Sequence, residues 1–113
     1  MVLYTELPVY GDTYELILKI FEYTNDFPKE FKYTLELEMK RDALHLLRSI
    51  YRANKHKNRA EQLDVFLDEF ELLKLEIRLS TDMKLLSIKK QVALSALMSS
   101  IGKQVTGWRN ASR

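Results

Sequence analysis

Residues 40–59, KRDALHLLRSIYRANKHKNR, combine a basic pattern and an apolar pattern at the spacing of one helix. At about 100° per residue, the basic side chains fall in one narrow stripe: Arg41, His45, Arg48, Arg52 and Lys55. The apolar side chains fall on the other side of the same helix: Ala43, Leu47, Ile50 and Tyr51. The stretch therefore predicts an amphipathic helix with an apolar face toward a core and a cationic ridge toward solvent.

The same stretch concentrates charge. It holds seven of the eighteen Lys and Arg residues and one acid, Asp42, for a local net charge of +6 in a chain whose net charge is +2. A basic stripe is more often a solvated surface than a binding site, so its meaning depends on the rest of the chain.

Composition favours a helical protein with one core. The 113 residues are 46% hydrophobic and 30% charged, with three Gly and two Pro, which is too apolar for disorder and too poor in turn residues for a many-stranded sheet. The absence of Cys and the presence of two His exclude a disulfide framework and a structural zinc site. The sequence shows neither a signal peptide nor an apolar run of about 18 residues, so we expect a soluble cytoplasmic protein with a single domain, residues 1–113.

The basic helix is bounded by helix-capping signals. Thr34 can cap its start, and we predict a helix over residues 35–57. Asn58 and Glu61 have the spacing of a capping box, which begins the next helix and places Arg59 at the junction.

Three further amphipathic helices are predicted, over residues 8–24, 59–83 and 88–107, and Ser87 can cap the start of the last. The first begins at Pro8 and presents one face with Tyr10, Ile17, Phe21 and Thr24. The core faces of the last two contain Leu63, Phe66, Leu67, Phe70, Leu73, Ile77, Leu94, Leu97, Met98, Ile101, Val105 and Trp108. Because the links are short, we expect an all-α protein, an antiparallel up-down four-helix bundle.

The last two helices carry more apolar surface than one core needs. Their second apolar faces consist of Val65, Leu72, Leu75, Leu79, Ile88, Val92 and Ala96. Deep burial of the third helix would explain them, but three or four residues per helix at helical spacing favour a self-association surface. We predict that these seven residues form an oligomer interface.

Charge alternates along the chain. Residues 1–39 carry a net charge of −5, residues 40–60 of +6, residues 61–82 of −5 and residues 83–113 of +6. The alternation can favour correct helix pairing, although surface ion pairs contribute only tenths of a kcal/mol each. However, the last segment has no acid, and a symmetric oligomer would repeat both cationic segments and attract phosphates. The predicted nucleic-acid contacts are Arg41, His45, Arg48, Arg52, Lys55, Arg59, Lys89, Lys90 and Lys103.

Signatures of catalysis are missing. The glycines at 11, 102 and 107 are too scattered for a phosphate-binding loop. Glu15 with Glu22, or Glu69 with Glu76, lack the Glu-x-x-His partner of carboxylate-bridged bundles, so solvated acidic faces are the better interpretation. We expect no active site, no cofactor and no metal site. The aromatic side chains of Tyr33, Tyr51 and Trp108 are expected to fill or close the core rather than to stack on bases.

Several segments resemble one protein family. These segments are Pro8-Val9-Tyr10, Thr13-Tyr14-Glu15-Leu16, residues 27–35 (FPKEFKYTL), residues 50–54 (IYRAN) and Gly107-Trp108. They are similar to the accessory variability determinant (Avd) proteins of diversity-generating retroelements. Those proteins belong to a wider group of four-helix bundles that includes proteins encoded in intervening sequences of bacterial large-subunit ribosomal RNA genes. The resemblance covers about residues 8–108, and residues 27–35, at a fixed distance before the basic helix, are its most specific part.

The resemblance implies a ring-like homopentamer that binds the element's reverse transcriptase and its RNA and supports mutagenic cDNA synthesis without catalysis of its own. Arg41, Arg48, Arg52 and Lys55 match the basic second helix of such proteins. Relatives often have paired arginines in the middle of that helix, whereas this chain has Lys40-Arg41 followed by Asp42.

Two other functions remain open from the sequence. The chain could be a helical protein-interaction scaffold in which alternating charge only pairs the helices, as in an intervening-sequence protein of unknown role. A carboxylate-bundle metalloenzyme is a more distant alternative.

Overall fold

The computed structural model describes residues 3–113 and shows an all-α protein, as predicted, with no strand in that range. Two short 3-10 helices accompany four α-helices. In chain order the elements are η1 (Tyr4–Glu6), α1 (Pro8–Thr24), η2 (Lys29–Phe31), α2 (Leu35–Lys55), α3 (Arg59–Asp82) and α4 (Ile88–Ala111).

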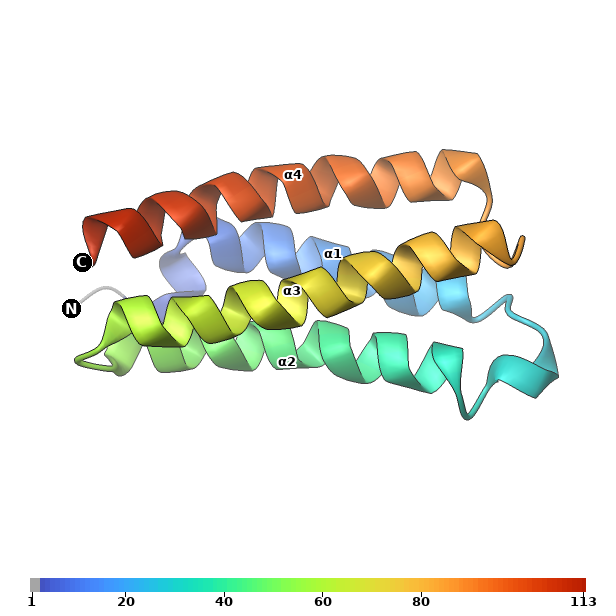
Figure 1. Ribbon diagram of the computed structural model, residues 1–113, viewed down its shortest axis with the longest axis horizontal. Coiled ribbons are helices and arrows are strands. Elements are labelled where there is room, and N and C mark those ends of the chain that lie inside the picture. The colour runs from blue at the N-terminus through green and yellow to red at the C-terminus, as the bar shows by residue number, and fades with distance from the viewer. Residues whose placement is uncertain (1–2) are drawn as a thin grey trace.

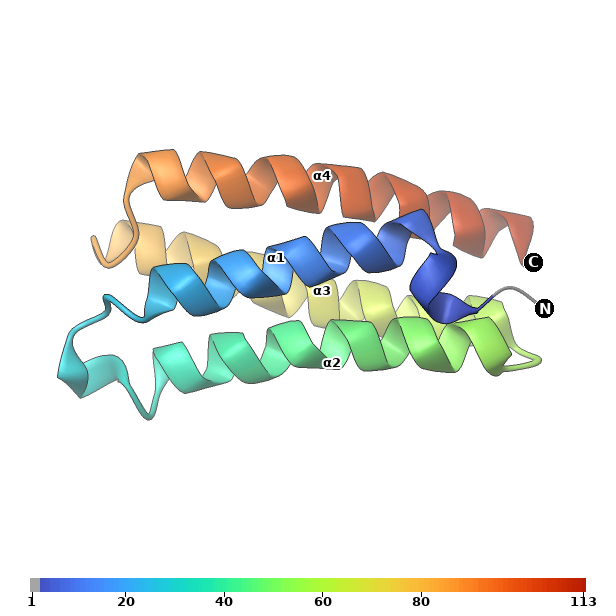
Figure 2. The same cartoon turned by 180° about the vertical axis from the view of Figure 1, so that it is seen from behind.

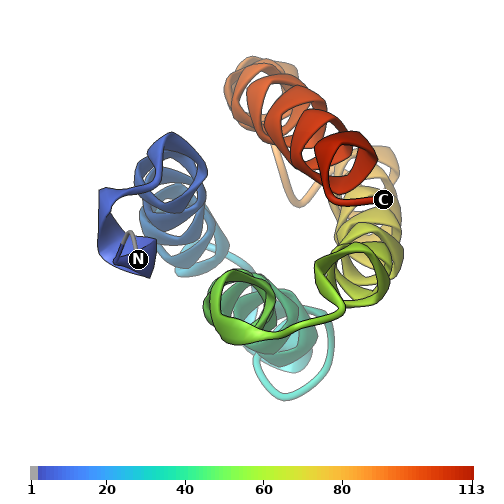
Figure 3. The ribbon, with the colours of Figure 1, turned by 90° about the vertical axis from the view of Figure 1, so that its left-hand side faces the viewer.

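The four α-helices lie along the long axis of a molecule that measures 43 × 24 × 21 Å (Figures 1 and 2). The colour ramp of Figure 1 runs in one direction through α1 and α3 and in the opposite direction through α2 and α4. Over residues 3–113, each α-helix packs against two neighbours, in the order α1, α2, α3, α4 and back to α1, and the backbones of the diagonal pairs do not approach each other closely. The end view shows the four helices arranged around one interior (Figure 3). None of them has the length and hydropathy needed to span a bilayer.

The core faces predicted for α3 and α4 are confirmed. Leu63, Phe66, Phe70, Leu73 and Ile77 of α3 are buried, and Leu67 is partly buried against them. On α4 the buried side chains are Leu94, Met98, Ile101 and Val105, with Leu97 and Trp108 packed partly buried at their edge. Because each fully buried Leu or Phe contributes about 1.5–3 kcal/mol, this continuous interior holds the helices together.

The face predicted for α1 is only partly right. The structure buries Val9, Thr13, Leu16, Ile17, Ile20 and Thr24. Tyr10 packs instead at the border, edge-on against the ring of Tyr4 in η1 at 5.5 Å between centroids. Phe21 is half-buried beneath the ammonium group of Lys40, at 5.2 Å. The aromatic residues that suggested the predicted face therefore lie along the margins of α1, and aliphatic side chains point inward.

Two of the three predicted N-caps are confirmed. The Asn58 side chain accepts a hydrogen bond from Glu61 N at 3.3 Å, and Ser87 Oγ accepts one from Lys90 N at 3.2 Å. The Glu61 carboxylate bonds to the Asn58 amide group rather than to its backbone N–H, which donates to His56 Nδ1. Thr34 precedes α2, but its side chain makes no capping bond.

α1 ends at Thr24, as predicted, and α3 ends at Asp82, one residue before the predicted end, but the ends of α2 and α4 differ more. α2 ends at Lys55 rather than at residue 57, because His56 has an extended backbone. α4 continues to Ala111, four residues beyond the predicted end, and Arg109 in its last turn forms an ion pair with Asp64 of α3. The turn after α3 holds Lys84 at a φ of 63°, a left-handed conformation that glycine usually adopts at a helix end.

Candidate functional site

The predicted basic stripe lies on the outer face of α2. Arg41, Arg48, Arg52 and Lys55 are exposed, and His45 is half-buried. The opposite side of α2 buries Met39, Ala43, Leu46, Ile50 and Ala53 in the core. The amphipathic pattern in the sequence thus places these cationic side chains in solvent.

Toward the end of α2 the basic side chains gather around two shallow hollows. Arg48, Tyr51, Arg52, Lys55, His56 and Gln62 line the first. Lys55, His56, Lys57 and Arg59 line the second, together with Ala111 and Ser112 from the end of the chain. Lys55 and His56 line both hollows, so the two hollows are adjacent. Arg59, which lines the second, therefore extends the basic stripe across the α2–α3 turn. We call Arg41, His45, Arg48, Arg52, Lys55 and Arg59 the α2 basic surface.

The centre of the α2 basic surface is not neutralised. Arg41 lies 3.9 Å from the carboxylate of Glu38, and His45 Nδ1 lies 3.9 Å from that of Glu69. Among residues 3–113, Arg48 and Arg52 form no ion pair with an acid. These two guanidinium groups are therefore available to an anionic ligand, and each can form a bidentate contact with a phosphate.

Tyr51 adds an aromatic ring to this surface. Its side chain is 42% exposed, contacts the Tyr4 ring edge-on at 5.1 Å between centroids, and lies under the Lys55 ammonium group at 4.5 Å. The prediction that Tyr51 and Tyr33 fill or close the core is wrong, because both side chains are exposed, Tyr33 to 77%. Trp108 packs against the core, as predicted.

The three predicted contacts on α4 are not gathered with the α2 basic surface. Lys89 and Lys90 occupy the first turn of α4, at the opposite end of the molecule from the α2–α3 turn (Figure 1). Lys90 lies 3.5 Å from the Asp26 carboxylate and stacks over the Tyr23 ring. Lys103 lines a groove between α3 and α4 together with Asp68, Glu71 and Lys74. One chain alone therefore does not bring these three lysines together with the α2 basic surface.

The second apolar faces predicted for α3 and α4 are exposed. Every one of the predicted interface residues lies on the surface: Val65, Leu72, Leu75, Leu79, Ile88, Val92 and Ala96. None of them lines the groove between α3 and α4, so the exposed apolar residues of α3 and those of α4 do not meet in that groove. We call Val65, Leu72, Leu75 and Leu79 the α3 apolar stripe, and Ile88, Val92 and Ala96 the α4 apolar stripe.

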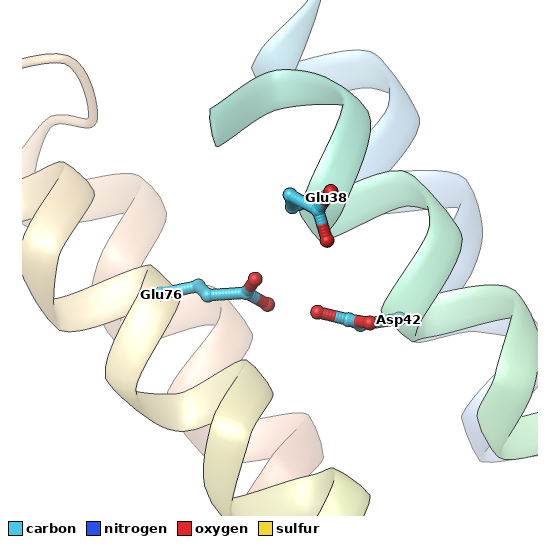
Figure 4. Close-up of side chains that lie close together, drawn as sticks. All are labelled: Glu38, Asp42 and Glu76. Carbon is cyan, nitrogen blue, oxygen red and sulfur yellow. The ribbon is translucent and has the colours of Figure 1, made fainter. Parts of the chain in front are cut away.

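An acidic cluster joins α2 to α3. Glu38 and Asp42, one turn apart on α2, face Glu76 of α3, and one oxygen from each carboxyl group lies within 4.8 Å of the others (Figure 4). Glu76 is buried, and burial together with the neighbouring Asp42 and Glu38 raises the pKa of its carboxyl group to about 8.

The sequence interpretation missed this cluster. It assigned Glu76 to a solvated acidic face and considered Glu69 as its partner, whereas Glu69 instead accepts a hydrogen bond from Ser49 Oγ. One signal was present: Glu76 follows Leu73 by three residues and precedes Ser80 by four, and both of those side chains are buried. That spacing places the carboxyl group on the border of the core face.

Comparison with known proteins places the chain in a family. The sequence model of a protein family described as bAvd-like matches residues 9–112. No curated protein matches the chain. The match spans all four α-helices and includes the α2 basic surface, both apolar stripes and the acidic cluster. The chain therefore belongs to the bAvd-like family, which confirms its resemblance to the accessory variability determinant proteins.

Proposed function

We propose that this chain is a non-catalytic accessory protein of a diversity-generating retroelement, which binds the element's reverse transcriptase and RNA in the cytoplasm and supports mutagenic cDNA synthesis. Membership of the bAvd-like family supports this role. The observation that carries the RNA-binding part is a pair of exposed arginines at the centre of the α2 basic surface, Arg48 and Arg52, which have no acidic partner among residues 3–113.

The contacts that we propose are to the RNA backbone. Guanidinium and ammonium groups on one helix face can follow successive phosphates, and their affinity comes from counterion release. Tyr51 offers one partly exposed ring, which is too little for a platform that reads several bases. We therefore expect strong dependence on salt and little dependence on RNA sequence.

We further propose that the up-down bundle assembles into a ring-like homo-oligomer, a pentamer by family resemblance. The α3 and α4 apolar stripes support this arrangement, because a ring needs two different surfaces on each subunit that contact each other head to tail. Each subunit would repeat the α2 basic surface. Lys89, Lys90 and Lys103 would then contribute to a positive field of the whole assembly rather than to one local site.

Binding measurements on a double charge reversal test the RNA-binding proposal. Arg48→Glu with Arg52→Glu should abolish RNA binding at moderate salt and leave the helical circular dichroism unchanged, because both side chains are exposed. In the wild type, affinity should fall steeply with salt. Replacing a single arginine that binds a phosphate should flatten the slope of log K against log salt by about 0.7 for a single strand.

The matched control is Lys29→Glu with Lys32→Glu, which changes the net charge by the same amount in the exposed connection between α1 and α2. This variant should lose much less affinity. Equal losses in both variants would mean that only net charge matters, and unchanged binding by the arginine variant would remove the α2 basic surface from the proposal. Co-purification with the element's reverse transcriptase tests the second partner separately.

A scaffold without nucleic-acid affinity is the second candidate, and one observation favours it. Two ion pairs among residues 3–113 connect different parts of the fold: Lys90 with Asp26 and Arg109 with Asp64. Alternating charge thus does pair neighbouring segments. This candidate predicts that the wild-type chain binds no RNA at low salt, whereas the first predicts binding.

A further inference from the structure

The proposed function does not explain why three carboxyl groups, those of Glu38, Asp42 and Glu76, lie close together. Figure 4 shows the Glu76 carboxyl group extending from α3 toward Asp42, with Glu38 one turn away on α2. The three groups provide carboxylate oxygens within 4.8 Å of one another, from two helices that are far apart in sequence. An acidic cluster alone is common on protein surfaces, so the burial of its members matters.

Glu76 is only 8% exposed, and its buried Oε1 atom has no hydrogen-bond partner in the part of the chain that the structure describes. Asp42 Oδ2 is also buried without a partner. Neither residue forms an ion pair with a Lys or Arg of residues 3–113, and within that range the ion pair that reaches the cluster joins Arg41 to the more exposed Glu38, at 3.9 Å. Buried carboxylate oxygens without donors are costly, and a cation between them would remove that cost.

We propose that Glu38, Asp42 and Glu76 bind one hard divalent cation of the Mg²⁺ and Mn²⁺ class, which bridges α2 and α3. Three carboxylates without nitrogen or sulfur ligands suit these ions rather than zinc or copper. The exposed side chain of Glu38 leaves one side of the site open to solvent, so water can complete an octahedral shell. This inference is independent of the proposed RNA-binding function, and it departs from the sequence-based expectation of no metal site.

A proton competes with the cation for the same oxygens. The charged groups that act on Glu76 are Asp42 and Glu38 of α2, and α4, which packs on the other side of α3, has no acid and forms no ion pair with Glu76. A carboxyl group binds a metal ion only when it is deprotonated, so binding is measured at alkaline pH.

The test is a titration of the purified full chain with Mn²⁺, followed by electron paramagnetic resonance and by isothermal calorimetry at pH 8. The expected result is one bound Mn²⁺ per chain, which Mg²⁺ displaces, and a rise in melting temperature on binding. Glu76→Gln and Asp42→Asn should each lower Mn²⁺ affinity at least tenfold. Glu22→Gln, which removes an exposed carboxylate of α1, is the matched control and should bind like the wild type.

Glu76→Gln keeps the shape of the side chain and removes a buried acid, so it should fold at least as well as the wild type, and circular dichroism checks this. Loss of Mn²⁺ binding from a folded Glu76→Gln chain would support the site. No saturable binding by the wild type at pH 8, or equal binding by the wild type and Glu76→Gln, would overturn it.

Discussion

Glu76 is the residue whose chemistry the fold changes most. The unfolded chain leaves its carboxyl group in water with a pKa near 4.5, and the folded chain raises the pKa to about 8 beside Asp42 and Glu38. Above pH 4.5 the unfolded state loses the proton that the folded state keeps, so folding becomes progressively less favourable up to pH 8. The Glu76 carboxyl group therefore does not lower the free energy of unfolding below pH 4.5, and it lowers that free energy at neutral and alkaline pH.

The first prediction concerns stability against pH. Glu76→Gln should raise the free energy of unfolding by roughly 2–4 kcal/mol at pH 8 and by much less at pH 5, because one pKa unit corresponds to 1.36 kcal/mol. The Gln amide group can still donate a hydrogen bond to Asp42. Urea unfolding followed by circular dichroism, in the presence of a chelator, measures the difference. A gain of the same size at both pH values, or a similar gain in Glu22→Gln, would contradict the assignment.

Sequence periodicity could place residues on helix faces but could not find this cluster. The stripe from Arg41 to Lys55 could be predicted from the 100° spacing, because all of its residues lie on one helix and the apolar residues of that helix show which side faces the core. Glu76 meets Asp42 only through the rotation of α3 relative to α2, which no spacing within one helix encodes. Tyr51 shows the same limit, since its ring was assigned to the core but packs on Tyr4 of η1, an element that was not predicted.

Helix starts were predictable because capping is local chemistry. α3 and α4 begin at residues 59 and 88, where the side chains of Asn58 and Ser87 cap them, and α1 begins at Pro8. α2 also begins where predicted, at residue 35, although the Thr34 side chain makes no capping bond. Helix ends were less predictable, since they depend on contacts with other elements. α4 continues past Gly107 to Ala111. Its last turns contact other elements, since Trp108 packs on the core and Arg109 forms an ion pair with Asp64 of α3.

The second prediction compares two caps that look alike in sequence. Asn58→Ala should lower the free energy of unfolding by about 1 kcal/mol, because the Asn58 side chain accepts the Glu61 N–H and would leave that donor unpaired. Thr34→Ala should change it much less, because the Thr34 side chain makes no capping bond. Denaturant unfolding of the two variants gives the comparison. Equal costs would show that Thr34 caps α2 in solution.

The largest unexplained feature of the whole molecule is its exposed apolar surface. Leu75, Ile88 and Val92 are 61%, 73% and 60% exposed, although each belongs to a regular helix with a filled core face. A soluble monomer seldom leaves so many apolar side chains in water at helical spacing. In our proposal, a second copy of the chain covers the α3 and α4 apolar stripes.

The third prediction is that one charge in either stripe prevents assembly. Leu75→Glu and Val92→Glu should each yield monomers by multi-angle light scattering at concentrations where the wild type is oligomeric, because each puts a carboxylate into a desolvated apolar contact. Leu18→Glu, at a similarly exposed position on α1, is the control and should leave the oligomer intact. A monomeric wild type at micromolar concentration would remove the basis of the ring.

Mixing the two variants distinguishes a head-to-tail ring from a symmetric dimer. If the α3 stripe of one subunit contacts the α4 stripe of the next, a Val92→Glu chain still offers an intact α3 stripe and a Leu75→Glu chain an intact α4 stripe. The mixture should then form a heterodimer that cannot close, with the mass of two chains, while each variant alone stays monomeric. If like stripes pair instead, each variant alone should form its own dimer through the stripe that remains, and mixing should add nothing. The mass of the unmixed variants therefore decides whether the exposed stripes can build a ring that repeats the α2 basic surface in every subunit.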